Sequence, residues 1–328
     1  LQELGASVTG LGLLPTPEMQ RGWPGLETRW PCHYGDIRDL TFVKSVFREV
    51  QPDIMFHMAA QPLVRLSYAD PIGTYATNVM GTAHVLESAR VTPSVQAAVV
   101  ATTDKCYENR EWDWGYRETD SVGGYDPYSS SKACAELLVA SYRRAFSDQV
   151  VCRRLATARA GNVIGGGDWA QDRLVPDMVR AICADEPIHL RRPSALRPWQ
   201  HVLEPLSGYL ILGMALAADR PESASAWNFG PQELDPLSVR ELAHHFVKTW
   251  GRGTVTEAND STGPHEAQYL KLDCSKAALR LGWRPLLRPA ERMQWTVDWY
   301  KQQQIEPEGI WDFTRHQIEQ MEARIREC

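Results

Sequence analysis

The sequence lacks the patterns that mark metal-binding, disulfide-rich, membrane-spanning and nucleic-acid-binding proteins. Its seven cysteines are scattered and contain no C-x-x-C pair, which favours reduced thiols over a disulfide framework or a zinc site. No apolar run approaches the ~20 residues of a membrane span. The net charge is −6 and no cluster of lysine and arginine is present, which argues against a nucleic-acid partner. We therefore expect a cytoplasmic protein with no metal, no membrane contact and no nucleic-acid partner.

The sequence also lacks the usual opening of a dinucleotide-binding fold. Such a fold begins with a strand, a glycine-rich turn and a helix whose N-terminus holds the pyrophosphate. This chain starts at what resembles the end of that helix, Leu1–Gly5, and continues into an expected strand, Ala6–Leu11. Gly10–Leu14 then ends without the acidic residue that often marks a preference for NAD. We expect an N-terminally truncated copy of the fold, without its first strand and glycine-rich turn.

The remaining pattern is an alternation of strands and helices. Strands separated by helices pair in parallel through right-handed crossovers. The pattern therefore predicts an α/β protein with a Rossmann-like, doubly wound parallel sheet, followed by a mostly helical C-terminal part. The expected strands are His33–Ile37, Asp53–His57, Ala97–Thr102 and Ala226–Phe229, and the expected helices are Leu40–Val50, Pro71–Arg90, Pro205–Ala217, Ser238–Trp250 and Pro289–Gln304.

Polar residues that can move protons follow one of these strands. Thr103, Asp104 and Lys105 stand where the Ala97–Thr102 strand ends, and Tyr128 and Lys132 open a helix that Asp126 and Pro127 predict to begin there. Four residues apart, the tyrosine and lysine share one helix face. An ammonium beside a phenol favours the phenolate, so we expect the pKa of Tyr128 to be lowered. Alone, Y-x-x-x-K also describes a surface pair, but its place after this strand end favours an active site.

Beyond these residues, the chain resembles a known family over nearly its whole length. It is similar to the extended short-chain dehydrogenase/reductases of the NAD-dependent epimerase/dehydratase family, and within them to the CDP-glucose 4,6-dehydratases. Lys105, where related dTDP-glucose dehydratases usually carry glutamate, points to this branch. The matching segments are His57–Arg65, Thr74–Gly81, Thr103–Tyr116, Gly123–Lys132, Ala160–Trp169, Arg197–Val202 and Tyr269–Lys276.

The resemblance implies a reaction and roles for the five residues. Tyr128 would take the proton of the glucose 4-hydroxyl while hydride leaves C4 for NAD. Water would then be eliminated across C5 and C6, with Asp104 as the acid that protonates the departing hydroxyl, and hydride would return to C6. Thr103 would hydrogen-bond the substrate oxygen, and Lys132 would support the phenolate. Lys105 would serve either as a neutral amine base at C5 or as a cation beside the enolate, and the sequence leaves both roles open.

The resemblance also assigns binding residues. Cofactor contacts fall on Asp36, Ile37, Ala59, Ala60 and Asn78, together with Tyr128 and Lys132. Contacts to the substrate, CDP-glucose, fall on Gln61, Asn162, Arg173, Leu174, Arg197 and His265. We expect residues 1–162 to form the NAD-binding domain and residues 163–328 the nucleotide-sugar-binding lobe, with segments around 197–230 returning to the first domain. The family also implies a homodimer formed through the helices Pro71–Arg90 and Ser131–Phe146.

Two other functions are compatible with the sequence. A nucleotide-sugar 4-epimerase shares the tyrosine–lysine pair and NAD, although epimerases tend to carry small residues where Asp104 and Lys105 stand. A non-catalytic scaffold descended from such an enzyme is favoured by the missing glycine-rich turn and disfavoured by the intact set of catalytic residues. Activity with CDP-glucose separates these possibilities.

Overall fold

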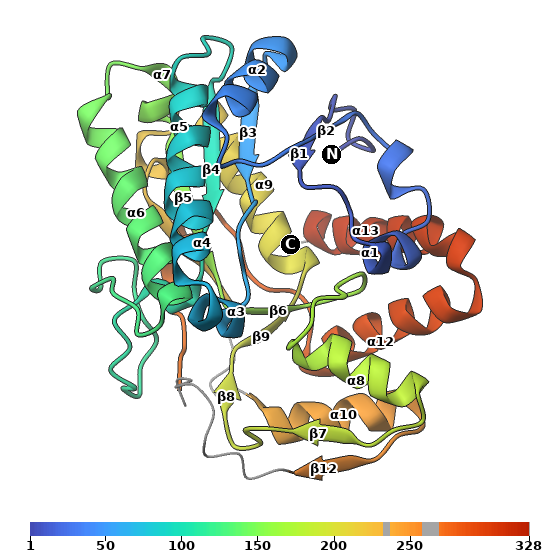
Figure 1. The fold of residues 1–328 in the computed structure, drawn as a ribbon. Helices are drawn as coiled ribbons and strands as arrows, with labels where there is room; N and C mark the ends of the chain where they lie inside the picture. The colour runs from blue at the N-terminus through green and yellow to red at the C-terminus, as the bar shows by residue number, and fades with distance from the viewer. Residues whose placement is uncertain (232–236, 258–268, 328) are drawn as a thin grey trace.

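A four-stranded parallel sheet forms the centre of the larger part of the molecule (Figure 1). The computed structural model describes residues 1–231, 237–257 and 269–327. The strands lie in the order β10-β5-β4-β3, and each neighbouring pair is parallel. Their bounds are β3 (Ile54–His57), β4 (Ala97–Ala101), β5 (Leu155–Ala160) and β10 (Ala226–Phe229). The predicted doubly wound parallel sheet is thereby confirmed.

Helices cover both faces of this sheet because its strands are apolar on both sides. Ala98 and Val100 of β4 pack with α2 (Leu40–Val50), α5 (Thr82–Arg90), α6 (Pro127–Ala145) and α7 (Val150–Arg153). The alternate residues of β4, Ala97 and Val99, pack with α9 (Leu203–Ala217) and Trp227 of β10 on the opposite face. Successive side chains of a strand point to opposite faces, so β4 contributes to two separate apolar cores.

The first strands form a sheet of their own. β1 (Gly10–Gly12) pairs in parallel with β2 (Cys32–Tyr34), and neither is bonded to the four-stranded sheet. The segment between them carries α1 (Pro17–Gly22) and lies beside the C-terminal helices (Figure 1). Residues 2–5 form a turn, so the expected helix end at Leu1–Gly5 is wrong, and β1 starts four residues later than expected.

The C-terminal part packs around a second large apolar core. Its central members include Met178, Phe246, Trp299 and Tyr300, all fully buried. They come from α8 (Leu174–Cys183), α10 (Val239–Trp250) and α12 (Pro289–Ile305), with α13 (Ile310–Arg326) packed against α12. Three small two-stranded sheets complete this part: β6 (Asn162–Ile164) with β9 (Trp199–His201), β7 (Ile188–Leu190) with β12 (Val255–Glu257), and β8 (Leu196–Arg197) with β11 (Leu237–Ser238).

The helix expected over Pro71–Arg90 is interrupted. It consists of α4 (Pro71–Tyr75), one stretch of π-helix, η2 (Ala76–Gly81), and α5, and it follows the short α3 (Val64–Ala69). A π-helical turn widens the helix by one residue and is common at functional sites. A further short helix, α11 (Ser275–Arg280), contacts β10. Among the described residues, no helix is long and apolar enough to cross a membrane.

Candidate active site

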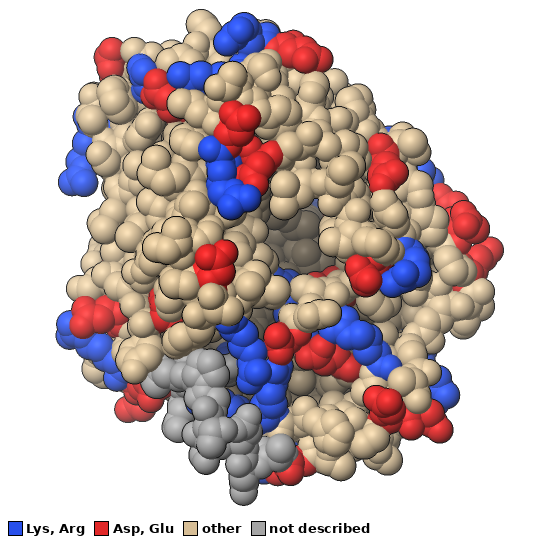
Figure 2. Space-filling view, viewed as in Figure 1, with Lys and Arg blue, Asp and Glu red and all other residues tan. Residues whose placement is uncertain are grey.

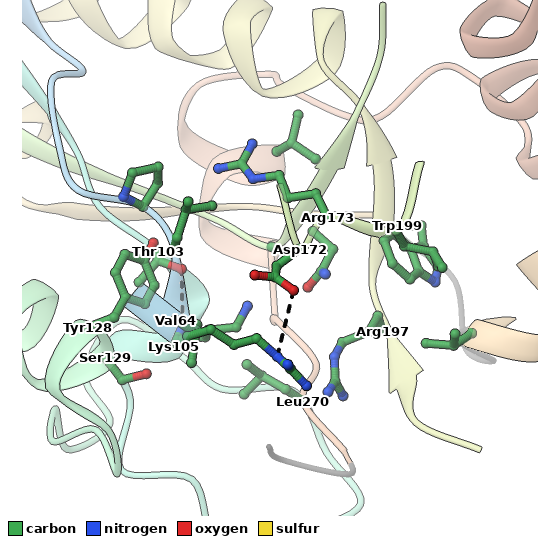
Figure 3. Close-up of a pocket in the computed structure, with 18 of the residues that line it drawn as sticks. Val64, Thr103, Lys105, Tyr128, Ser129, Asp172, Arg173, Arg197, Trp199 and Leu270 are labelled. Atoms are coloured by element: carbon green, nitrogen blue, oxygen red, sulfur yellow. Dashed lines mark hydrogen bonds and ion pairs between the residues drawn. The ribbon is translucent and has the colours of Figure 1, made fainter. Parts of the chain in front are cut away.

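A cavity of about 830 Å³ opens between the carboxyl ends of the main sheet and the C-terminal part of the molecule. Figure 2 shows the hollow on this face, with Lys and Arg side chains gathered along one side of it. Seven of the predicted site residues line it: Thr103, Lys105, Tyr128, Asn162, Arg173, Leu174 and Arg197. Figure 3 shows that Thr103, Lys105 and Tyr128 lie on one side and Arg173 and Arg197 on the other.

Asp104 lies directly beneath the cavity wall and does not line it. Its side chain is fully buried, at 0% exposure. One carboxylate oxygen, Oδ1, accepts a hydrogen bond from Thr103 Oγ1 at 3.1 Å and lies 3.6 Å from Lys105 Nζ. The other oxygen, Oδ2, is buried without a hydrogen-bond partner. A buried carboxylate oxygen with unused capacity is suited to hold a hydroxyl that reaches it from the cavity.

The sequence fixes Tyr128 and Lys132 at the start of α6. Asp126 caps the helix by accepting hydrogen bonds from the N–H and the hydroxyl of Ser129, as the sequence predicts. Both side chains are buried, and Lys132 Nζ donates to the carbonyl oxygen of Ala101 at 3.2 Å, at the end of β4. Lys132 thus joins the helix to the strand that carries Thr103, and its ammonium lies behind the cavity wall.

The expected lowering of the Tyr128 pKa is wrong for the protein without ligands. Burial raises the pKa of Tyr128 to about 12, and the charge of Asp104 adds to the rise. Hydrogen bonding with Thr103 and the positive charge of Arg173 oppose it. Burial also lowers the pKa of Lys132, to about 8. The helix spacing reveals the proximity of Tyr128 and Lys132, but it does not reveal how strongly the sheet desolvates both.

Asn78 anchors the loop that follows β3. Its Oδ1 accepts from the backbone N–H of Gln61 at 2.8 Å, and its Nδ2 donates to Gln61 O at 3.0 Å and to Ser131 Oγ at 2.9 Å. The π-helical turn carries Asn78, which is 1% exposed. Gln61 is held in addition by Thr74 and Leu63. Asn78 and Gln61 therefore shape the site from behind rather than line the cavity.

Charged pairs line the far side of the cavity. Arg173 Nη1 donates to Asp168 at 2.9 Å, and the buried Arg197 closes the wall beside Trp199. Asn162 lies between these residues and the sheet, and its Oδ1 is buried without a hydrogen-bond partner. Guanidinium groups and an unused amide oxygen suit a ligand that carries both phosphates and hydroxyls.

Four of the predicted cofactor residues, Asp36, Ile37, Ala59 and Ala60, follow the carboxyl ends of β2 and β3 and do not line this cavity. Asp36 forms a two-point ion pair with Arg38 at 2.6 and 2.9 Å, which lowers the pKa of Asp36. Ile37 is 5% exposed, and Ala59 and Ala60 are half-buried. An ionised carboxylate, an apolar side chain and two small residues offer the chemistry of an adenosine site. The described residues contain no glycine-rich strand-to-helix turn at this edge.

Sequence reasoning missed the charges at the cavity mouth. Asp172 pairs with Arg191 at 2.5 Å and lies 3.9 Å from Arg65 Nε, so one carboxylate bridges α3 and the loop after β7. Asp172 has φ of +61°, in the left-handed region. Arg65 lies inside a segment that carries the family resemblance, but nothing in the sequence pairs it with Asp172. The predicted substrate residue His265 lies outside the described residues.

The comparisons with known proteins agree with this geometry. The model of the GDP-mannose 4,6 dehydratase family matches residues 18–294. A CDP-glucose 4,6-dehydratase of Salmonella typhimurium is 47% identical over 92% of this chain and 85% of its own length. A dTDP-glucose 4,6-dehydratase of Streptomyces antibioticus is 31% identical over 81% of this chain and 75% of its own length.

Solved structures show the same fold. A dTDP-glucose 4,6-dehydratase from Streptomyces venezuelae, with NAD bound, superposes with a TM-score of 0.72 at 25% identity, over 86% of this chain and 83% of its own. A UDP-glucose 4-epimerase from Thermotoga maritima superposes with a TM-score of 0.78 at 20% identity, over 93% and 94% of the two chains, and shows the fold alone. The chain belongs to the GDP-mannose 4,6-dehydratase family of short-chain dehydrogenase/reductase enzymes.

Proposed function

We propose that this chain converts CDP-D-glucose to CDP-4-keto-6-deoxy-D-glucose and water. The observation that carries the proposal is the row of Thr103, Lys105 and Tyr128 along a cavity large enough for a nucleotide sugar, with Asp104 beneath it. These residues occur in a chain 47% identical to a CDP-glucose 4,6-dehydratase. The reaction class is that of a hydro-lyase, and the nucleotide-sugar substrate follows from the family.

Oxidation at C4 needs a base for the 4-hydroxyl, and Tyr128 is placed for it. Thr103 and Tyr128 lie side by side on the cavity wall, so one substrate oxygen can contact both (Figure 3). Tyr128 takes the hydroxyl proton, and Lys132 behind it provides the positive charge that favours the phenolate. Because the pKa of Tyr128 is about 12 without ligand, the phenolate must gain stabilisation when the cavity is filled.

Elimination across C5 and C6 needs an acid and a group at C5. Asp104 donates a proton to the departing 6-hydroxyl through Oδ2, the oxygen that has no partner in the free protein. Lys105 is partly exposed on the cavity side and contacts Asp104. It removes the C5 proton as an amine or stabilises the enolate as a cation.

NAD is the proposed cofactor, and the residues present fit its adenosine end. Asp36 supplies an ionised carboxylate, Ile37 an apolar surface, and Ala59 and Ala60 leave the backbone after β3 open to close approach. Lys132 and Asn78 hold the other end of the site in place. When bound, NAD would supply the acceptor for the hydride that leaves C4 of the sugar and, once reduced, the donor of the hydride that is returned to C6.

We further propose the arrangement of the rest of the molecule. Arg173, Arg197 and Asn162 contact the diphosphate and sugar, and His265 and Leu174 stay as predicted contacts. Residues 1–162 form the cofactor-binding domain and 163–328 the nucleotide-sugar lobe; the parallel pairing of β10 with β5 supports a return of residues near 197–230 to the first domain. A cytoplasmic location is supported by six described cysteines that are all free.

A homodimer through α4, η2, α5 and α6 is part of the proposal. Ile72, Met80 and Leu137 are 77%, 53% and 57% exposed on these helices. Large exposed apolar side chains on adjacent helices are common at interfaces.

Product analysis with CDP-glucose tests the proposed function. The full-length protein is incubated with NAD and, in separate reactions, with CDP-, dTDP-, UDP- and GDP-linked hexoses, and the products are identified by NMR. The proposal expects a 4-keto-6-deoxy sugar from CDP-glucose at a kcat/KM at least tenfold above that of the other nucleotides. A C4 epimer would identify a 4-epimerase, and no turnover of any sugar would favour the scaffold.

A further inference from the structure

Helix α6 carries a third buried titratable group, Glu136, one turn beyond Lys132. The carboxylate of Glu136 is 4% exposed. It accepts hydrogen bonds from Thr102 Oγ1 at 2.5 Å, Thr157 Oγ1 at 2.7 Å, and Arg159 Nε and Nη2 at 2.9 and 2.8 Å. Burying a carboxylate is costly unless it is paired and hydrogen-bonded, and this one is satisfied on both oxygens.

The partners of Glu136 lie on the two central strands of the sheet. Thr102 directly follows β4, and Thr157 and Arg159 belong to β5. Lys132 bonds to Ala101, the residue before Thr102. Two successive turns of α6 are therefore attached to two successive residues at the end of β4. The chain continues from β4 into Thr103 and Asp104. The two attachments therefore fix the position of Tyr128 relative to Thr103 and Asp104.

Glu136 is also the anion that faces Lys132. The other titratable groups around the ammonium are His57 on β3 and Cys106 on η3 (Asp104–Cys106), and Tyr128 lies one turn before Lys132 on α6. Burial keeps His57 and Tyr128 neutral near pH 7 and raises the pKa of Cys106 far above its usual range. Arg159 outweighs burial and lowers the pKa of Glu136, whose charge in turn raises the pKa of Lys132 against the effect of burial.

We propose that Glu136 is a positioning residue for the Tyr128–Lys132 pair: it locks α6 onto β4 and β5 and provides the buried negative charge that Lys132 faces. Arg159 is the counter-ion that allows this carboxylate to remain charged inside the protein. Arg159 also lies over the ring of Tyr107, 4.7 Å from its centre, so the network extends under the strand end that carries Asp104. Only the kinetic part of the test rests on the proposed function.

The charge of Lys132 can be measured directly without turnover. The protein is prepared with lysine carrying ¹³C at Cε, the Lys132 signal is assigned from its loss in Lys132→Met, and its titration is followed by NMR. Glu136→Gln and the double variant Glu136→Gln/Arg159→Met are compared with Glu87→Gln. The control removes a carboxylate that pairs with Arg90 at 2.7 and 2.8 Å on the neighbouring helix α5.

The proposal expects the titration midpoint of Lys132 to fall by about one pH unit or more in both Glu136 variants and to stay unchanged in Glu87→Gln. In the active protein, the alkaline limb of kcat moves down with it, while KM for CDP-glucose changes less than about twofold. A folded variant with an unchanged Lys132 midpoint overturns the proposal. Failure of both Glu136 variants to fold also overturns it, because Glu136 would then serve folding alone. A shifted midpoint in the variants, combined with no turnover by the unchanged protein, leaves this proposal standing and counts against the proposed function.

Discussion

At the scale of single residues, Asp104 is the least expected feature of the site. The sequence places a proton donor at the end of β4, and the structure buries its carboxylate completely beneath Thr103 and Lys105. Gly161 leaves room on its other side, since a Cβ at that position would lie 3.3 Å from Asp104 Oδ2. The missing side chain at Gly161 therefore keeps space open beside the oxygen without a partner, which suits a hydroxyl arriving from the cavity.

Replacing Asp104 by asparagine separates the two halves of the reaction. Asn keeps the shape and the contact with Thr103 but cannot donate a carboxylic proton. We expect Asp104→Asn to retain oxidation at C4, seen as absorbance of the reduced cofactor, and to lose formation of the 6-deoxy product by about 10²- to 10⁴-fold. Full dehydration by this variant would remove Asp104 from the role of acid.

Asp172 places a negative charge in the cavity wall next to Arg173, a proposed contact of the diphosphate. Its carboxylate bridges Arg191 and Arg65, which both line the cavity. Asp172→Asn removes this negative charge from the cavity wall, so we expect CDP to bind roughly two- to fivefold more tightly, the range of a partly exposed ion pair. Asp185→Asn is the matched control, because Asp185 also has a positive φ and is exposed. Calorimetry measures both, and weaker or equal CDP binding by Asp172→Asn contradicts this role.

Some properties of the site residues could be predicted from the sequence, and others depend on contacts between distant segments. The pairing of Tyr128 with Lys132 on one helix face could be predicted because helix geometry is local. The pKa of Tyr128 could not, because it depends on burial and on Thr103, Asp104 and Arg173, which are distant in sequence. The same holds for Asp172 and Arg65, whose contact exists only after α3 and the loop before α8 meet.

At the scale of elements, local signals predicted the helix that carries the site. Asp126 as cap and Pro127 as first residue placed the start of α6 correctly, and the apolar spacing of Leu40–Val50 gave α2 with its observed bounds. The π-helical turn at Ala76–Gly81 could not be predicted. It is stabilised by the long-range bonds of Asn78 to Gln61 and Ser131, which a helical period does not encode.

Removing the cap of α6 tests how strongly this helix start supports the site. Asp126→Ala loses two hydrogen bonds to Ser129 and the favourable charge at the helix N-terminus. We expect the free energy of unfolding to fall by about 1–2 kcal/mol. Urea unfolding measures it, and Asp126→Asn, which keeps a capping oxygen, should recover more than half of the loss. Equal stability of the alanine variant and the unchanged protein would contradict the capping role.

At the scale of the whole molecule, the alternation of strands and helices in the sequence predicts the fold class. It does not predict the cavity. Strands separated by helices dictated a parallel sheet with two covered faces, and the structure has both cores. The cavity forms where the sheet ends meet the core around Trp299 and Phe246. That meeting depends on the packing of α8, α10 and α12, so the sequence identified several lining residues only through family resemblance.

Two buried histidines make the whole molecule sensitive to acid. Burial lowers the pKa of His57 and of His201 to about 3. In the unfolded chain each histidine has a pKa near 6.5, so the unfolded chain binds more protons than the folded protein between about pH 6.5 and 3. The free energy of unfolding is therefore highest above about pH 6.5 and falls as the pH drops toward 3. We expect each histidine to lower the free energy of unfolding by about 2 kcal/mol at about pH 5, relative to neutral pH.

Urea unfolding followed by tryptophan fluorescence, at neutral pH and at about pH 5, measures this loss. Between neutral pH and about pH 5, His201→Asn should lose less stability than the unchanged protein. His316→Asn, at an exposed position, should lose as much as the unchanged protein. An unfolding midpoint that does not change with pH would show that neither histidine is held neutral.

The transfer of hydrogen from C4 to C6 within the substrate is the most direct test of the proposed dehydration. CDP-glucose carrying deuterium at C4 is converted by the full-length protein with NAD in ordinary water, and the product is examined by NMR and mass spectrometry. We expect the deuterium at C6 of the 4-keto-6-deoxy product and a proton from solvent at C5. Deuterium retained at C4 of an epimer, or a product without deuterium, would contradict it.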